Sequence, residues 1–187
     1  PLEIGKFPHD LLKRLLAGVE SNDPTVVIGP GIGEDAAVLE VGGRLLVAKS
    51  DPVTLATDRI GWYAVQVNAN DVATMGAQPR WFLSTILLPE EAKPSLAEAI
   101  FSQVIAACKA LDITLIGGHT EITYGLPRPV AVGALLGEAD KAAVFLTSGV
   151  QAGDSIVLTK GVAIEGTAIL AREAPDAQAE AGVDAGV

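Results

Sequence analysis

The sequence predicts an α+β fold, with a complete first domain in residues 1–140 and the beginning of a second domain in residues 141–187. With 187 residues and 49% hydrophobic positions, the chain can bury a substantial core. Short aliphatic runs of strand length alternate with two long apolar runs of helical length. Aromatic residues make up only 4% of the chain, so we expect a core of aliphatic side chains packed between sheet and helices.

Periodicity and turn residues predict the elements of the first domain. Leucines at helical spacing over residues 11–16 indicate a short amphipathic helix. Two long helices are expected, and the one over residues 59–77 is apolar on nearly every face. The other spans residues 94–111 and begins with a proline. Strands are expected at residues 25–28, 36–41, 44–49, 80–88, 113–116 and 129–136, and a polar loop at residues 117–126.

The pattern restarts after Gly137. We expect a turn over residues 149–154, a strand over residues 155–159 and the start of a helix over residues 165–173. The remaining residues are rich in Ala, Glu and Asp and have almost no apolar pattern, so the second domain is expected to be truncated.

Charge and composition exclude several classes of function. A net charge of −10 and a pI near 4.5 argue against binding nucleic acid or an anionic membrane over a broad surface. No segment approaches the roughly 20 apolar residues of a membrane helix. The single cysteine, Cys108, falls on the interior periodicity of the second long helix and is expected in the core. We therefore expect a cytoplasmic protein that binds neither nucleic acid nor membrane.

Three acidic groups stand at the ends of apolar elements, where a carboxylate needs a cation or hydrogen-bond donors. The first is Asp35, which follows a glycine-rich segment. Gly31 and Gly33 would let the backbone approach phosphate groups, and the adjoining carboxylate could bind the accompanying magnesium. The alternative interpretation of this segment is an ordinary turn.

The other two groups are Asp51, after an aliphatic run, and Asp71, which follows Asn70 inside the most apolar helix. Asp51 could be a turn or cap residue. Asp71 is harder to explain without a partner, because burying an unpaired carboxylate is costly. Either it binds a metal or phosphate, or it forms a structural ion pair with a buried Arg or Lys.

A fourth polar cluster contains Gly118, His119 and Glu121. His119 could be a ligand, a phosphate donor or a general base, and a hydrogen-bonded surface histidine is the simpler alternative.

Together, residues 31–38, 50–51, 70–79 and 117–121 resemble the superfamily of aminoimidazole ribonucleotide (AIR) synthetase. Its members include thiamine-monophosphate kinase, selenophosphate synthetase, formylglycinamidine synthase and the hydrogenase maturation factor of the carbamoyl-dehydrating type. Residues 153–160 and 164–168 look most like the start of the second domain in the hydrogenase-maturation branch.

The resemblance implies a mixed sheet packed by two long helices, with a second copy completing a β-barrel across a homodimer. It implies ATP and Mg²⁺ as cofactors. Carried over by position, the metal ligands would be Asp35, Asp51, Asp71 and Glu121. The nucleotide-binding residues would be Gly31, Gly33, Asp35, Asp51, Asn70 and Gly118. The catalytic residues would be His119 and Asp71. Relatives have an acidic residue where this chain has His119, so either Glu121 replaces that ligand or His119 contacts a phosphate directly.

The implied function is ATP-dependent phosphoryl transfer that activates a carbonyl or carbamoyl oxygen, with a role in hydrogenase maturation. The partner would be a small-molecule substrate or a carbamoylated protein. The alternatives are a small-molecule kinase of the thiamine-monophosphate type and a nucleotide-binding regulatory protein without catalysis. The maturation factors use a cysteine at their extreme C-terminus, and residues 1–187 reach no such position, which leaves carbamoyl chemistry open.

Overall fold

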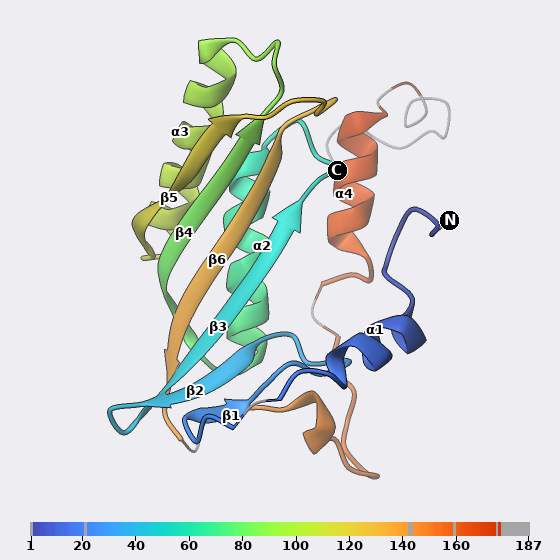
Figure 1. Ribbon diagram of the computed structural model, residues 1–187, viewed down its shortest axis with the longest axis vertical. Coiled ribbons are helices and arrows are strands. Elements are labelled where there is room, and N and C mark those ends of the chain that lie inside the picture. The colour runs from blue at the N-terminus through green and yellow to red at the C-terminus, as the bar shows by residue number, and fades with distance from the viewer. Residues whose placement is uncertain (1, 21, 142–143, 159, 175, 177–187) are drawn as a thin grey trace.

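The computed structural model describes residues 2–20, 22–141, 144–158, 160–174 and 176 (Figure 1). The helices are α1 (His9–Leu16), α2 (Ile60–Thr74), α3 (Pro94–Ala110) and α4 (Ile164–Glu173), with a short 3-10 turn at Thr147–Gly149. The strands are β1 (Val26–Ile28), β2 (Ala37–Val41), β3 (Arg44–Val53), β4 (Gln78–Leu88), β5 (Thr114–Ile122) and β6 (Val130–Ala139).

The strands form one sheet in the order β1-β2-β3-β6-β4-β5. All neighbours are antiparallel except β4 and β5, which run parallel because α3 provides the crossover between them. The last strand, β6, lies between β3 and β4, and it pairs with both along most of its length. The sheet is therefore mixed, as expected.

The two long helices cover one face of the sheet (Figure 1). Side chains from α2 and α3 and from alternate residues of β3, β4 and β6 form the core, in which Ile60, Met75, Phe82 and Leu135 are almost completely buried. The opposite face carries no helix within the part of the chain that the structure describes (Figure 1). Leu83 lies on that face and is 36% exposed.

Glycines allow α2 to lie very close to its neighbours. A Cβ on Gly61 would lie 2.5 Å from the backbone oxygen of Ile100 on α3. A Cβ on Gly133 of β6 would overlap the Asn68 side chain of α2 and lie 2.7 Å from the Phe82 ring. The side chain of Asn68 thus rests directly on the backbone of the sheet.

Most of the predicted elements are confirmed, and three predictions are wrong. First, β3 does not end at Lys49 but continues to Val53, so Asp51 lies within a strand. Proline is tolerated at position 52 because β2 pairs with β3 only as far as Ala48, which leaves the remainder of β3 with a partner on one side.

Second, residues 117–122 are not a loop but the second half of β5. They lack an apolar pattern because β5 is an edge strand whose second half is exposed at every position. Third, residues 155–158 form no strand, and residue 159 lies outside the described residues. Val157 is 80% exposed there, and none of residues 155–158 belongs to the sheet.

Candidate carboxylate and lysine site

Lys49 joins the carboxylates of β3 and α2. Lys49 and Asp51 lie on the same face of β3 as the buried Val47 and Val53 and face α2, which carries Asp71. The Lys49 Nζ lies 2.7 Å from Asp71 Oδ2 and 3.7 Å from Asp51 Oδ2. The Lys49 side chain is only 16% exposed and that of Asp71 only 24%. The structure thus brings together Asp51 and Asp71, and Lys49 is the partner that the sequence interpretation had left as an alternative.

The charge of Lys49 is stabilised by the surrounding acids. Burial lowers the pKa of Lys49, but the hydrogen bond to Asp71 and the charges of Asp71, Asp51 and Asp35 outweigh it, so the pKa lies above the ordinary value. Lys49 is therefore a fully charged ammonium at neutral pH. Asp51 and Asp71 form ion pairs with Lys49, whereas Asp35 acts on it only through its charge and lines the same cavity as Lys49.

The cavity beside Lys49 has a volume of about 390 Å³. Its wall is formed by α1, by the loop between β1 and β2 and by β3, and it includes Gly31, Glu34, Asp35, Lys49 and Ser50. Gly33 in the same loop has a φ of 87°, a conformation that favours glycine. Glu34 Oε2 is buried there without a hydrogen-bond partner among the described residues.

The donor set of this site fits a hard cation. Mg²⁺ prefers carboxylate oxygens, and this site supplies Asp35, Asp51, Asp71 and the unpartnered oxygen of Glu34. Within the described residues, however, no three His, Cys, Asp or Glu side chains are already close enough together to hold a metal ion. Lys49 supplies the positive charge that these carboxylates face in the structure.

Asn68 contacts the backbone of the site, and the sequence interpretation did not identify it. It is completely buried, and its Nδ2 donates hydrogen bonds to the backbone oxygens of Asp51, at 3.2 Å, and Ala64, at 2.8 Å. Asn70, which the sequence placed in the site, is exposed. A polar residue one helical turn before Asp71 on a very apolar helix was the signal that could have indicated Asn68.

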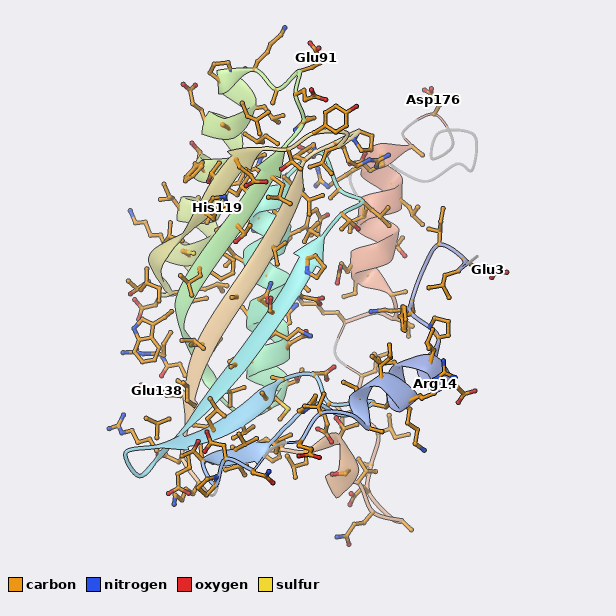
Figure 2. The ribbon with its side chains drawn as sticks, in the orientation of Figure 1. Glu3, Arg14, Glu91, His119, Glu138 and Asp176 are labelled. Atoms are coloured by element: carbon orange, nitrogen blue, oxygen red, sulfur yellow. The ribbon has the colours of Figure 1, made fainter. Side chains whose placement is uncertain are left out.

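His119 and Glu121 are not brought to the carboxylates. The cross-strand register aligns His119 with Thr85, Val132 and Pro52, whereas Asp51 aligns with Gly133, Ser84 and Gly118. Each such set of aligned residues forms a cross-strand row, and the side chains of adjacent rows point to opposite faces of the sheet. The side chain of His119 therefore lies on the face away from α2. It also lies three strand spacings from β3, about 14 Å at 4.8 Å per strand. Figure 2 shows His119 at the β5 edge of the sheet.

His119 and Glu121 interact with each other instead. The His119 Nε2 lies 2.9 Å from Glu121 Oε2, and the Thr123 hydroxyl donates to Glu121 Oε1 at 2.8 Å. The hydrogen bond to His119, followed by that from Thr123, lowers the pKa of Glu121. Of Gly118, His119 and Glu121, only Gly118 lies in the same cross-strand row as Asp51. Its backbone lies so close to Ser84 that a Cβ would overlap the Ser84 carbonyl group.

No helix in the described part of the chain combines the length and the hydrophobicity that crossing a membrane requires.

Comparison with known proteins gives the family. The profile of the AIR synthase related protein, N-terminal domain, matches residues 33–139. A putative hydrogenase expression/formation protein of Methanocaldococcus jannaschii is 27% identical over 175 residues, which cover 89% of this chain and 51% of that protein. A selenide, water dikinase of Citrifermentans bemidjiense is 34% identical over 193 residues, covering 97% of this chain and 52% of that protein.

A solved structure of a ThiL protein complexed with AMPPCP and TMP superposes with a TM-score of 0.56 at 27% identity, covering 70% of this chain and 40% of the other. The chain spans about half the length of the curated relatives it matches. The matched residues 33–139 contain Asp35, Lys49, Asp51 and Asp71, and they run from the end of the glycine loop to the last strand of the sheet. The chain belongs to the AIR synthase related protein family, of which it contains the N-terminal domain.

Proposed function

We propose that this chain binds ATP with Mg²⁺ as the nucleotide-binding half of a phosphoryl-transfer enzyme. One observation carries the proposal: Asp51 of β3 and Asp71 of α2 meet at Lys49, and Lys49 lines a cavity together with Asp35 of the glycine loop. A solved relative holds AMPPCP, an analogue of ATP, which supports a nucleotide at this kind of domain.

Each part of the site has a role in this proposal. Asp35, Asp51 and Asp71 would hold Mg²⁺, and Gly31 and Gly33 would let the backbone amides of the loop approach the phosphate groups. The bound metal would neutralise the charge of the transferred phosphoryl group. Asn68 would fix the backbone of Asp51 through its hydrogen bond to the Asp51 carbonyl.

The preferred reaction is phosphoryl transfer from ATP to a carbonyl or carbamoyl oxygen, in a hydrogenase-maturation role with a small-molecule or carbamoylated protein partner. The similarity to a hydrogenase expression/formation protein over 89% of this chain supports this role. A second candidate is a kinase for a small phosphate ester, supported by the solved ThiL complex, which contains both TMP and the nucleotide analogue. Incubating the protein with ATP and each class of acceptor, and following release of inorganic phosphate against formation of a phosphorylated product, separates the two.

We also propose that the chain forms a homodimer through the sheet face that α2 and α3 leave open. Alternate residues of β3, β4 and β6 on this face are apolar, including Leu46, Leu83, Val132 and Leu136. A second copy of this face would bury these side chains. Sedimentation velocity at micromolar concentration tests the proposal, and a single monomeric species contradicts it.

The test of the nucleotide site is its dependence on a divalent cation. The chain carries a net charge of −10, and the site adds several carboxylates to it, so ATP without a metal meets strong repulsion. We expect calorimetric titration with ATP to show binding in magnesium buffer and at least tenfold weaker binding in EDTA. Equal affinity in the two buffers would show that the carboxylates do not take part in nucleotide binding.

A further inference from the structure

Lys49 is a residue of the candidate site for which the sequence interpretation gave no role. It lies in the middle of β3, and it is the only Lys, Arg or His in the described residues that forms an ion pair with Asp51 or Asp71. The neighbouring inward-facing residue, Val47, is completely buried, so Lys49 extends from the apolar core into the acidic cluster. Its ammonium thus occupies the position between carboxylates that a metal ion requires.

We infer that Lys49 is a built-in counter-cation that makes metal binding depend on the triphosphate. This inference rests on the proposed ATP site. In the chain without nucleotide, the ammonium at 2.7 Å from Asp71 Oδ2 neutralises part of the negative charge that would otherwise attract a divalent cation. A metal ion arriving alone must displace Lys49 from Asp71 and leave an ammonium that is 16% exposed without its partner.

The triphosphate removes this obstacle. It offers phosphate oxygens as new partners for the ammonium, and the flexible four-carbon side chain of lysine can move from a carboxylate to a phosphate without a change in the backbone. Asp71 is then released to the metal ion that accompanies the nucleotide. Metal and nucleotide therefore bind together, and the carboxylates do not collect a metal ion in the absence of ATP.

The inference predicts effects of opposite sign for a single substitution. Lys49→Met keeps an unbranched side chain, one atom shorter than that of lysine, and removes its charge. Without nucleotide, the variant should bind Mn²⁺, which takes the oxygen ligands of Mg²⁺ and is visible by electron paramagnetic resonance, at least tenfold more tightly than the wild type. With ATP present, the same variant should bind Mn·ATP at least tenfold more weakly, because the phosphate partner is gone. A role in stability alone would not move the two affinities in opposite directions.

Two further variants serve as controls. Lys49→Arg keeps the charge and should resemble the wild type in Mn²⁺ binding without nucleotide. Lys141→Met removes a lysine whose ion pair with Glu40, at 2.6 Å, lies on the surface, and should change neither affinity. If Lys49→Met does not fold in EDTA, Lys49→Gln is titrated instead. The inference is overturned if neither neutral variant binds Mn²⁺ more tightly than the wild type.

The failure of the inference is distinguishable from the failure of the proposed function. A wild type that binds Mg·ATP, together with neutral variants whose Mn²⁺ affinity is unchanged, overturns the role of Lys49 alone. A wild type that binds no ATP in magnesium buffer overturns the proposed site, and the inference with it.

Discussion

Glu173 on α4 accepts hydrogen bonds from both the backbone N–H and the hydroxyl of Thr57, at 2.6 and 2.7 Å. Beside it, Arg172 Nη1 lies 3.1 Å from Asp58 Oδ2. These two contacts fasten the last described helix to the turn between β3 and α2, the two elements that carry Lys49, Asp51 and Asp71. A segment from the predicted second domain therefore holds the turn that connects the two elements of the candidate site.

This contact should weaken in acid. The hydrogen bonds from the backbone and the hydroxyl of Thr57 lower the pKa of Glu173 from its ordinary value of 4.5. Because the pKa is depressed in the folded state, the stabilisation is complete above pH 4.5 and is lost as the pH falls through the folded pKa. We expect the amide of Thr57 to exchange with solvent faster as the pH falls below 4.5, after correction for the intrinsic rate.

Substitution at the same position should reproduce the acid effect at neutral pH. Glu173→Gln removes the charged acceptor, so the protection of the Thr57 amide should fall at pH 7. Glu165→Gln on the same helix is the matched control and should leave it unchanged. Identical exchange in the wild type and in Glu173→Gln at pH 7 would show that the carboxylate does not hold the turn.

Asp71→Asn should affect both stability and nucleotide binding. The substitution leaves Lys49 with Asp51 at 3.7 Å as its remaining carboxylate neighbour, which should cost about 1–2 kcal/mol of unfolding free energy for a partly exposed pair. If Asp71 also binds the metal, Mg·ATP affinity should fall about 10- to 100-fold, or roughly 1.4–2.8 kcal/mol. Denaturant titration and calorimetry measure the two effects, with Asp140→Asn at an exposed position as control. A loss of stability with unchanged Mg·ATP affinity would show that Asp71 only forms a structural ion pair and does not bind the metal.

Gly133→Ala should be among the most damaging small substitutions in the chain. Its Cβ would overlap Asn68 and lie 2.7 Å from the Phe82 ring, and both neighbours are completely buried. Moving α2 away to relieve the overlap should cost about 2–4 kcal/mol. Gly166→Ala on α4 is the control, because its Cβ meets nothing within 4 Å and alanine favours the helix. Urea denaturation of the two variants should give opposite signs, and equal stability would argue against close packing of α2.

The thiol of Cys108 should be unreactive in the folded protein. Cys108 is 3% exposed, and burial raises the pKa of its thiol to about 11. At pH 8 about one molecule in a thousand then carries the thiolate that reacts with disulfide reagents. Ellman's reagent should label Cys108 only after unfolding, whereas Ser102→Cys, an exposed position on the same helix, in a Cys108→Ala background should react at once. Rapid labelling of the native wild type would contradict the core assignment.

The sequence predicted the helices well because their apolar runs are long. It also indicated Asp35, Asp51 and Asp71, since each carboxylate interrupts or ends an apolar segment. Lys49 could not be assigned, because its role depends on β3 continuing past it and on α2 lying across the strand. These are tertiary features, which a local sequence pattern does not predict. The residues around His119 were expected in a loop because an exposed edge strand needs no alternation of apolar side chains.

The position of β6 has a consequence for how the protein is made. β3 and β4 are not neighbours in the sheet, and the strand between them is the last of the six to be synthesised. Until residues 130–139 leave the ribosome, β3 and β4 expose unpaired backbone on the edges that will become the centre of the sheet. The pairing of β3 with β6 joins residues far apart in the sequence, from Leu45 with Ala139 to Val53 with Ala131, and such contacts form slowly. Until β6 inserts, these two edges are therefore open to pairing with other chains.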